Sequence, residues 1–326
     1  FDGLNLSYRA SERILVSTVF GQPVNSASDG LESERTFYGA SIDYGPVFEN
    51  LELGLFFIQQ DIEGIVDRQA VGTEFRYFGD KQSIWGLIDY DTTYNEISSA
   101  FLQGSWRITQ RLNVSGSFDQ RHTPYLSAGS ALIGQPVESF SELLVFFSEG
   151  EIRQFSIDRT PISNSATLGA SYSLSPRMQI NVDVNQTTVD AAPESGGIAA
   201  MPEASYTYFS TTLVASSLFK EGDSTMFSLR YSDSNSAQVT ALMIDSRYPI
   251  GTRWRINPRL RVDRRQIMSD SSNEWQYTPG LRLQYRPNRK FRMELEAGKQ
   301  FSQRALETSN LDRESYFVSL GYQVFF

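Results

Sequence analysis

The last twelve residues, SYFVSLGYQVFF at positions 315–326, decide how the rest of the chain is interpreted. Apolar side chains occupy every second position from Tyr316 to Phe326, whereas the positions between them include Ser319 and Gly321. Side chains of a β-strand alternate between its two faces, so this stretch predicts a strand with one apolar face and one largely small or polar face. Such a strand suits a wall between lipid and water. An ordinary terminal strand of a soluble sheet is the alternative on these residues alone.

Composition narrows the class of protein. The chain has 326 residues, a formal charge of −9, no cysteine and 40% hydrophobic residues. This is enough apolar surface for a folded chain, and the length allows one large β domain or two ordinary ones. No run approaches the roughly 18 apolar residues that a membrane-spanning helix needs, so a helical membrane protein is excluded. A mean hydropathy of −0.34 is compatible with a transmembrane barrel, because only alternate residues of its strands meet lipid.

Other functional classes receive little support. The lack of cysteine removes disulfides and thiol chemistry and is compatible with an oxidising compartment. The net acidity weighs against nucleic-acid binding, and the sequence has no basic cluster with stacking aromatics. It also has no phosphate-cradling glycine motif, zinc pattern or calcium-loop spacing, so we expect no cofactor and no metal site.

Segments of alternating residues repeat along the chain, each close to the roughly 9–11 residues with which a tilted strand crosses a bilayer. About seventeen segments can be counted, joined in turn by short turns and longer polar loops. Two length classes of connection are typical of an outer-membrane barrel, with short periplasmic turns and longer outer loops. A soluble sandwich would not sort its turns so regularly. A lectin-like or propeller-like soluble fold is the alternative, although no propeller or solenoid repeat is visible. We therefore predict one antiparallel transmembrane β-barrel of about 16–18 strands over residues 1–326.

The odd strand count bears on the extent of the protein. Bacterial single-chain barrels have even strand numbers, yet counting back from Phe326 makes the first strand a descending one. Either one strand is miscounted or these residues are the C-terminal part of a longer protein, and we favour the second interpretation slightly. The chain starts at Phe1 without a signal peptide, which fits a mature chain or a fragment.

The longest interruption of the strand pattern is an insertion at residues 123–164. Within it, residues 137–158 have a helical rather than a strand-like pattern. Ser139 with Glu142, and Ser148 with Glu151, have the spacing of a capping box. The insertion therefore predicts two short helices within the barrel chain.

These helices carry more apolar surface than an exposed loop usually does. We expect them to fold inward as a plug or constriction of the lumen, or to form an external lid on neighbouring loops. A surface for a partner is a third option. The apolar candidates for the plug or constriction are Leu143, Leu144, Phe146, Phe147, Ile152 and Phe155.

The predicted strand at residues 254–266 has the strongest charge pattern of the chain. Its arginines share one face and its apolar residues share the other. An arginine at the lipid-facing midplane costs about 2–4 kcal/mol, so the arginine face must meet water. In a pore it would attract anionic solutes and set selectivity; alternatively, arginine and glutamate rows cross-pair and stiffen a wide barrel. The predicted pore-lining residues are Arg255, Arg259, Arg261, Arg265, Arg282, Arg292, Glu294 and Glu296.

Two prolines interrupt predicted strands in the same region. Pro258 and Pro279 each remove a backbone hydrogen-bond donor, so we expect local bulges at these positions.

His122 is the only histidine and lies at the predicted outer end of a strand. Ser127, Ser130 or Asp119 could in principle complete a hydrolytic arrangement with it, but their spacing gives such a site no support. We therefore expect a solvated or aromatic-belt histidine, no catalytic residues and no enzymatic activity.

The end of the chain is similar to a known targeting signal. Ser319, Gly321, Val324 and Phe326 follow the pattern polar-x-Gly-x-x-apolar-x-apolar and resemble the C-terminal assembly signal of Gram-negative outer-membrane β-barrels. The resemblance implies delivery by the barrel assembly machinery to the outer membrane, where the partners are lipid and lipopolysaccharide.

A narrower resemblance covers more of the chain. It is similar to the C-terminal barrel region of large outer-membrane proteins that carry tetratricopeptide repeats upstream. The resemblance implies a role in envelope export or as a scaffold, with a periplasmic repeat region or other envelope proteins as partners. It implies no catalytic residues. The stretches that prompt the resemblance are TFYGASIDYG (36–45), DRQAVGTEFRYF (67–78), ALIGQ (131–135), residues 149–160 and residues 257–263.

These patterns together predict an outer-membrane pore or export conduit with an arginine-rich lumen and a loop plug or constriction. The alternative is a non-conducting anchor or scaffold that holds a periplasmic or cell-surface assembly in the outer membrane. The residues alone name neither the solute nor the direction of transport.

Overall fold

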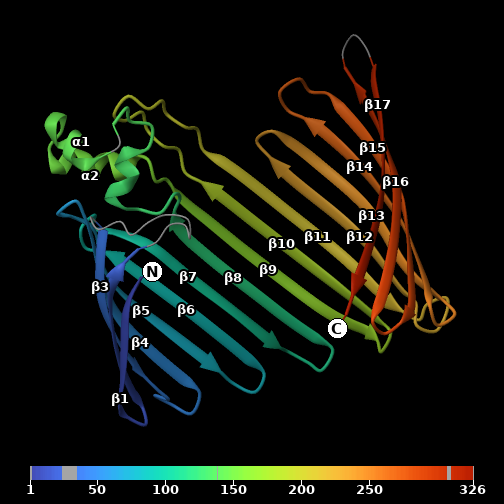
Figure 1. Ribbon diagram of the computed structural model, residues 1–326, viewed down its shortest axis with the longest axis horizontal. Coiled ribbons are helices and arrows are strands. Elements are labelled where there is room, and N and C mark those ends of the chain that lie inside the picture. The colour runs from blue at the N-terminus through green and yellow to red at the C-terminus, as the bar shows by residue number, and fades with distance from the viewer. Residues whose placement is uncertain (1, 24–34, 138, 307–309, 326) are drawn as a thin grey trace. The chain divides into compact units, whose positions relative to one another are not determined.

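The computed structural model describes residues 2–23, 35–137, 139–306 and 310–325. In these residues seventeen antiparallel strands belong to one sheet, and successive strands form hairpins (Figure 1). The prediction of an all-β antiparallel fold with about seventeen strands is therefore confirmed. The strands are β1 (Asp2–Ser11), β2 (Ile14–Gln22), β3 (Arg35–Tyr44), β4 (Leu51–Ile62), β5 (Ile65–Phe78), β6 (Gln82–Asp91), β7 (Glu96–Arg107), β8 (Leu112–His122), β9 (Ile162–Ser175), β10 (Met178–Val189), β11 (Ala204–Ser216), β12 (Ser224–Ser234), β13 (Ala237–Ile250), β14 (Trp254–Ile267), β15 (Asn273–Asn288), β16 (Phe291–Ala305) and β17 (Asn310–Val324).

The chain forms two compact units. The first unit comprises residues 1–107, 115–166 and 187–204 and contains β1–β7 with the insertion between β8 and β9. The second unit comprises residues 108–114, 167–186 and 205–326 and contains β11–β17.

Connections between strands do not sort by length as predicted. Odd-numbered strands finish at one end of each unit, which we call the 'turn end'. Even-numbered strands finish at the opposite end, which we call the 'loop end'. At the loop end, residues 123–161 and 190–203 are long connections, but β4–β5 and β12–β13 are joined by two residues each. Short turns and longer loops therefore alternate in part of the chain, but not at these two hairpins.

The second unit has one apolar sheet face. Cα partners of neighbouring antiparallel strands point to the same side. Trp254 pairs with Tyr285, Tyr285 with Met293, and Met293 with Tyr322, so one apolar row crosses β14–β17. This face is exposed: Leu320 in the middle of β17 has 73% of its surface accessible.

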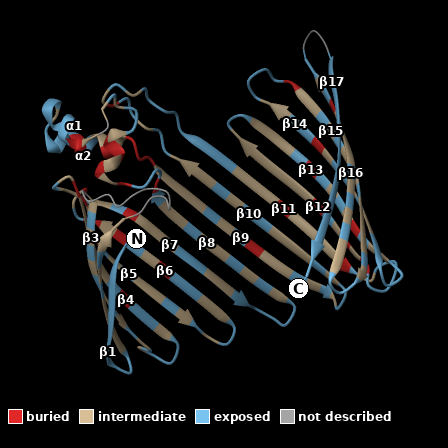
Figure 2. Ribbon diagram, in the orientation of Figure 1, coloured by how far each residue is buried: buried red, intermediate tan, exposed pale blue. Residues whose placement is uncertain are grey.

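The first unit has an apolar face of the same kind. Its register joins Tyr8 to Val16, Val16 to Ile42 and Ile42 to Leu55 across β1–β4. Exposed and half-buried residues alternate along β3. In Figure 2 the strands carry both exposed residues, in pale blue, and half-buried residues, in tan. The opposite face of this unit mixes charged residues with aromatic ones such as Phe101.

Aromatic side chains gather near both ends of the apolar face of the second unit. Near the turn end, the rings of Trp254 and Tyr285 lie 4.3 Å apart between centroids. Near the loop end, Trp275 and Tyr277 lie stacked at 6.3 Å. The turn-end row is Tyr248, Trp254, Tyr285, Phe291 and Tyr322, and the loop-end row is Tyr231, Trp275, Tyr277 and Phe301.

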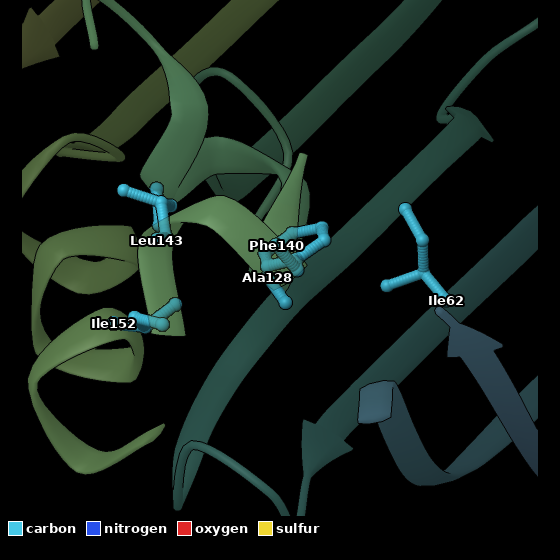
Figure 3. Close-up of a cluster of buried hydrophobic side chains, with 6 residues drawn as sticks. Ile62, Ala128, Phe140, Leu143 and Ile152 are labelled. Atoms are coloured by element: carbon cyan, nitrogen blue, oxygen red, sulfur yellow. The ribbon is translucent and has the colours of Figure 1, made fainter. Parts of the chain in front are cut away.

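The main buried core lies in the insertion rather than in the sheet (Figure 2). The insertion forms the 3₁₀-helix η1 (Ala128–Leu132) and the helices α1 (Phe140–Phe146) and α2 (Glu149–Asp158). Figure 3 shows Phe140 and Ala128 between Ile62, at the loop end of β4, and the more distant Leu143 and Ile152. The buried members are Ile62, Ala128, Ala131, Phe140, Leu143 and Ile152.

Candidate functional site

The predicted charged residues share one face of the second unit. Arg282 pairs with Asn257 on β14 and with Glu296 on β16, so the three strands present these side chains to one side. The alternation of β14 and β16 places the other predicted residues on that side too. The set is Arg255, Arg259, Arg261, Arg265, Arg282, Arg292, Glu294 and Glu296.

Five of these residues form a continuous ion-paired chain across three strands. The Arg282 guanidinium lies 2.7 Å from Glu296 and 3.1 Å from Glu294. Arg259 forms an ion pair with Glu296, and Arg292 lies 2.8 Å from Glu294. Opposite charges therefore alternate along the chain, which is the cross-paired arrangement that the sequence left open.

Small residues make room for these long side chains. A Cβ atom on Gly280 would lie 2.7 Å from Nε of Arg259, so a larger residue there would displace this side chain from its path across β15. Ser319 and Gly321 of β17 lie opposite Glu296 and Glu294. The polar half of the predicted assembly signal thus borders the ion-paired chain.

Three arginines of β14 are less completely paired. Arg261 makes two hydrogen bonds to Asp263, at 2.8 and 2.9 Å, and its side chain is 47% exposed. Arg265 lies 4.0 Å from Glu274 and is 51% exposed. Arg255 is exposed and forms no ion pair with any residue that the structure describes. This row offers the accessible positive charge of the face.

The two helices begin where the capping-box spacing predicts. The Ser139 side chain accepts a hydrogen bond from the backbone N–H of Glu142 at the start of α1. At α2 the capping box is complete, because Glu151 also accepts from the Ser148 backbone N–H at 2.8 Å. These contacts satisfy N–H groups that have no partner within the helix.

The six apolar candidates of the insertion divide into two groups. Leu143 and Ile152 are buried, and the Phe147 and Phe155 rings pack edge to face with centroids 5.0 Å apart. Leu144 and Phe146 lie on the other side of α1, and Phe146 is 71% exposed. Four of the six candidates therefore belong to the packed core of the insertion, and two face away from it.

The tip of the β4–β5 hairpin holds α1. Glu63 occupies this two-residue turn at a φ of 48°, a left-handed conformation that glutamate rarely adopts. Its carboxylate accepts hydrogen bonds from the backbone N–H groups of Phe140, at 3.2 Å, and Ser141, at 3.0 Å. Asp67, which is fully buried, accepts another from Gly129 of η1 at 3.2 Å.

The insertion also covers charged residues of the β5–β7 face. The Arg68 guanidinium forms an ion pair with Asp89 and lies 4.8 Å from the centre of the Tyr125 ring. Pairing of Gln60 with Arg68 places Arg68 on the same side as Phe56 and Glu52, opposite the apolar face. The insertion thus lies over the sheet face of the first unit that is opposite its apolar face.

Nearby phenol and hydroxyl groups are buried under the insertion. The Tyr94 hydroxyl donates to the Asp67 backbone oxygen at 3.2 Å, and burial raises the pKa of this phenol. The Ser156 side chain is fully buried and donates to the Ile152 backbone oxygen at 3.2 Å.

His122 is buried, which contradicts the expectation of a solvated or aromatic-belt residue. Its exposed fraction is 4%, and Nδ1 lies 2.5 Å from the Thr160 backbone oxygen. The insertion folds back over the end of β8 and covers the ring, a long-range contact that local spacing could not reveal. In the described part of the chain, no three His, Asp or Glu side chains are grouped as metal ligands would be.

The C-terminal signal residues lie largely in β17. Ser319, Gly321 and Val324 are paired with β16, whereas Phe326 lies outside the described residues. Among the described helices, none is long and apolar enough to cross a membrane.

The fold and its charged face define a many-stranded antiparallel β protein with two chemically different sheet faces. No family model matches the chain, and no curated protein matches it. One solved structure that aligns with the chain is outer-membrane expressed OmpT of Vibrio cholerae, with 10% sequence identity and a TM-score of 0.44. The alignment covers 98% of this chain and 99% of that chain.

Two further structures are similar over most of their length. OprD of Pseudomonas aeruginosa has 9% identity, covers 94% of each chain and gives a TM-score of 0.39. An anion-selective porin from Comamonas acidovorans has 9% identity, covers 96% of this chain and 97% of that chain, and gives a TM-score of 0.38. The resemblance to proteins with tetratricopeptide repeats stays a prediction.

Proposed function

We propose that this chain is an outer-membrane β-barrel that forms a pore or export conduit. One observation carries the proposal: an exposed apolar sheet face bordered at both ends by aromatic side chains. Along β15 and β16 these aromatic rows are separated by eight to ten residues, or roughly 27–34 Å of strand. A strand tilt of about 40° reduces this separation to roughly 21–26 Å along the bilayer normal. Outer-membrane barrels have an apolar band about 25 Å tall between two aromatic girdles.

Water is a poor environment for this face. Contiguous apolar patches on soluble monomers rarely exceed a few hundred square ångströms, whereas here the apolar rows cross all the strands of each unit. Lipid contact removes the cost of exposing them. Closure of the strands into a barrel would satisfy the backbone groups that an open sheet edge leaves unpaired.

The charged face then lines the aqueous side of the wall. At the midplane of a lipid-facing surface each arginine costs about 2–4 kcal/mol, so the six predicted arginines support a water-filled interior. The accessible positive charge of Arg255, Arg261 and Arg265 favours anionic solutes.

The insertion acts as the constriction in this proposal. Support comes from its position over Arg68 and Asp89, on the face opposite the apolar one. Its buried core and the Glu63 and Asp67 hydrogen bonds give it a fixed place at the loop end of the first unit.

Single-channel recording of the purified chain in planar bilayers tests the proposal. We expect open current that increases when residues 137–158 are replaced by a short Gly-Ser linker. Tyr125→Ala is a milder variant that loosens the insertion without shortening the chain, and we expect a smaller increase. Absence of current in all three proteins, each shown to be inserted, contradicts a pore.

The ion-paired chain favours a second candidate, a non-conducting anchor or scaffold. Three of the predicted pore arginines form ion pairs with Glu294 and Glu296, as expected if these rows fill and stiffen the interior. An inserted protein that is silent with and without the insertion supports this alternative. Barrel assembly machinery, lipopolysaccharide and a periplasmic tetratricopeptide-repeat region or other envelope proteins are partners under either candidate.

Catalysis plays no part in the proposed function. His122 makes its contacts to Thr160 in a buried site, and we propose that it supports the docking of the insertion.

A further inference from the structure

Basic residues are concentrated at the turn end of the second unit. Its five connections there are residues 108–111, 176–177, 217–223, 251–253 and 289–290, and each contains at least one Lys or Arg. The same end of the first unit is balanced, because its connections at 12–13, 45–50 and 79–81 contain two basic and three acidic residues. The basic residues of the second unit are Arg111, Arg177, Lys220, Arg253, Arg289 and Lys290.

The opposite end of the second unit has the reverse character. Its connections at 235–236, 268–272 and 306–309 contain no Lys or Arg in the sequence. Among the connections of this unit, the basic residues are thus confined to one end.

These basic side chains are available to a ligand. All six are exposed, and none forms an ion pair within the part of the chain that the structure describes. Of the two acidic residues in the same connections, Asp223 is buried and accepts backbone hydrogen bonds from Leu218, Phe219 and Lys220. Only Glu221 is left to offset the six positive charges.

Backbone hydrogen bonds hold the basic positions in place. The Arg111 and Arg177 oxygens accept from Ser173 and Ser216, both at 2.8 Å. The Arg253 and Lys290 oxygens accept from Arg286 and Phe325, also at 2.8 Å. Neighbouring hairpins are therefore tied together at this end, with successive connections roughly 10 Å apart.

Aromatic residues adjoin three of the basic ones. Phe219 precedes Lys220, Trp254 follows Arg253, and Phe291 follows Lys290. Phe219 is 68% exposed. An aromatic side chain beside a Lys or Arg is typical of the membrane–water interface, where the ring lies at the headgroup level and the charge reaches the phosphates.

We propose that the turn end of the second unit binds the headgroups of anionic phospholipids in the adjacent leaflet. This inference rests on the proposed function, because it requires the apolar face to contact lipid. Charge spread at one or two residues per hairpin fits a layer of headgroups better than the concentrated contact of a protein partner. Five of the seven basic residues at this end, counting Arg286, are arginines, and a guanidinium can bind a phosphate through two hydrogen bonds.

Fluorescence quenching by brominated lipids tests the proposal in vesicles. One variant keeps Trp254 at the turn end and carries Trp85→Phe, Trp106→Phe and Trp275→Phe. A second keeps Trp275 at the loop end and carries the matching substitutions. We expect Trp254 to prefer brominated phosphatidylglycerol over brominated phosphatidylcholine by about fivefold, the effect of one well-placed basic residue. High salt should reduce this preference.

Substitutions identify the charges responsible. Arg253→Gln, Arg289→Gln and Lys290→Gln together should abolish the preference at Trp254. Arg264→Gln, which removes a charge near the other end of β14, should leave it unchanged. If a single-tryptophan variant does not refold, the number of phosphatidylglycerol molecules retained by the otherwise unaltered protein and by the triple variant, measured by native mass spectrometry, gives the same comparison.

Equal quenching of Trp254 by both lipids overturns the lipid proposal and leaves membrane insertion intact. If both lipids quench Trp254 equally and the protein also binds polyglutamate in a salt-sensitive manner, this end binds an acidic protein instead. That result also overturns the lipid proposal. If neither lipid quenches Trp254 or Trp275, the proposed outer-membrane function itself fails.

Discussion

Arg282 shows what a single side chain contributes to the charged face. Its guanidinium bridges Glu294 and Glu296 on the neighbouring strand, and through them it connects to Arg292 and Arg259. Glu296 is the most shielded member, with 13% of its side chain exposed. Replacing the Glu296 carboxylate by an amide of similar shape therefore changes the charge of this face more than the packing of its side chains.

Glu296→Gln should raise the permeability of the pore to anions relative to cations. The substitution leaves Arg259 and Arg282 without one carboxylate, so the positive potential along this face increases. We expect a stability change of about 1 kcal/mol or less, because the paired arginines are partly solvated. Reversal potentials in a salt gradient measure the selectivity.

The matched control for this substitution is Glu314→Gln. Glu314 lies 2.8 Å from Lys299 and points to the apolar side of the same pair of strands. The same change in charge there should leave the reversal potential unaltered. Equal shifts in both variants would contradict the assignment of Glu296 to the aqueous side.

Glu63→Gln should loosen helix α1 from the β4–β5 hairpin. The carboxylate accepts two backbone N–H groups, and charged acceptors at a helix start are stronger than neutral ones. We expect chymotrypsin to cleave within residues 140–147 several-fold faster, at a cost of about 1 kcal/mol in local stability. Asp158→Asn, at the far end of α2, is the control and should not alter cleavage of α1.

The helices illustrate what sequence predicts at the level of an element. Capping-box spacing located the starts of α1 and α2, because that signal depends on residues three positions apart. Which sides of α1 are buried depends on distant partners such as Ile62, so the exposure of Leu144 and Phe146 was not predicted.

The strands show the same distinction. Alternation predicted the faces of β14–β17 correctly, but bulges at Pro258 and Pro279 were a wrong prediction. Pairing continues in one register on both sides of each proline, with Tyr277 opposite Phe301 and Gly280 opposite Gly298. Long flanking strands hold the register, so a missing donor interrupts the hydrogen bonds without inserting a residue.

Acidification should fray the N-terminus of α2. Hydrogen bonds from the Ser148 backbone N–H and side chain hold the pKa of Glu151 below its usual value. A carboxyl with a depressed pKa stabilises the helix end fully above its ordinary, unfolded pKa, and this contribution is lost as the pH falls through the depressed value. Hydrogen exchange of residues 149–152, corrected for intrinsic rates, should therefore increase in acid.

Ser148→Ala should reduce that pH dependence, since it removes the hydroxyl partner of Glu151 and leaves only the backbone N–H. It should also cost about 1 kcal/mol of local helix stability at neutral pH. Glu149→Gln breaks the neighbouring pair with Arg153 and serves as the control. A pH dependence that is undiminished in Ser148→Ala but disappears in Glu149→Gln would show that the wrong carboxylate was chosen.

At the scale of the whole molecule, the period of two was the most informative signal. It predicted the strand number and the two faces of the sheet, because strand geometry fixes alternation locally. It did not predict the partners within the charged face or the burial of His122, because both depend on strand order and on the folding back of the insertion.

Adjacent residues of β17 test the two faces directly. Leu320→Arg places a charge in the middle of the apolar face, and we expect membrane insertion to become about 2–4 kcal/mol less favourable. Ser319→Arg makes the same addition one residue earlier, opposite Glu296 on the charged face, and should cost little. Refolding into vesicles with urea unfolding compares the two, and similar losses would contradict a lipid-facing assignment.

The spacing of the aromatic rows sets a preferred acyl-chain length. Strand segments of eight to ten residues tilted by about 40° span roughly 21–26 Å along the bilayer normal. This height is below the ~30 Å hydrocarbon thickness of a typical membrane, so bilayers of long-chain lipids must become thinner next to the protein. The chain should thus insert most readily into bilayers of short fatty acids, and it should gather such lipids around itself in a mixed membrane.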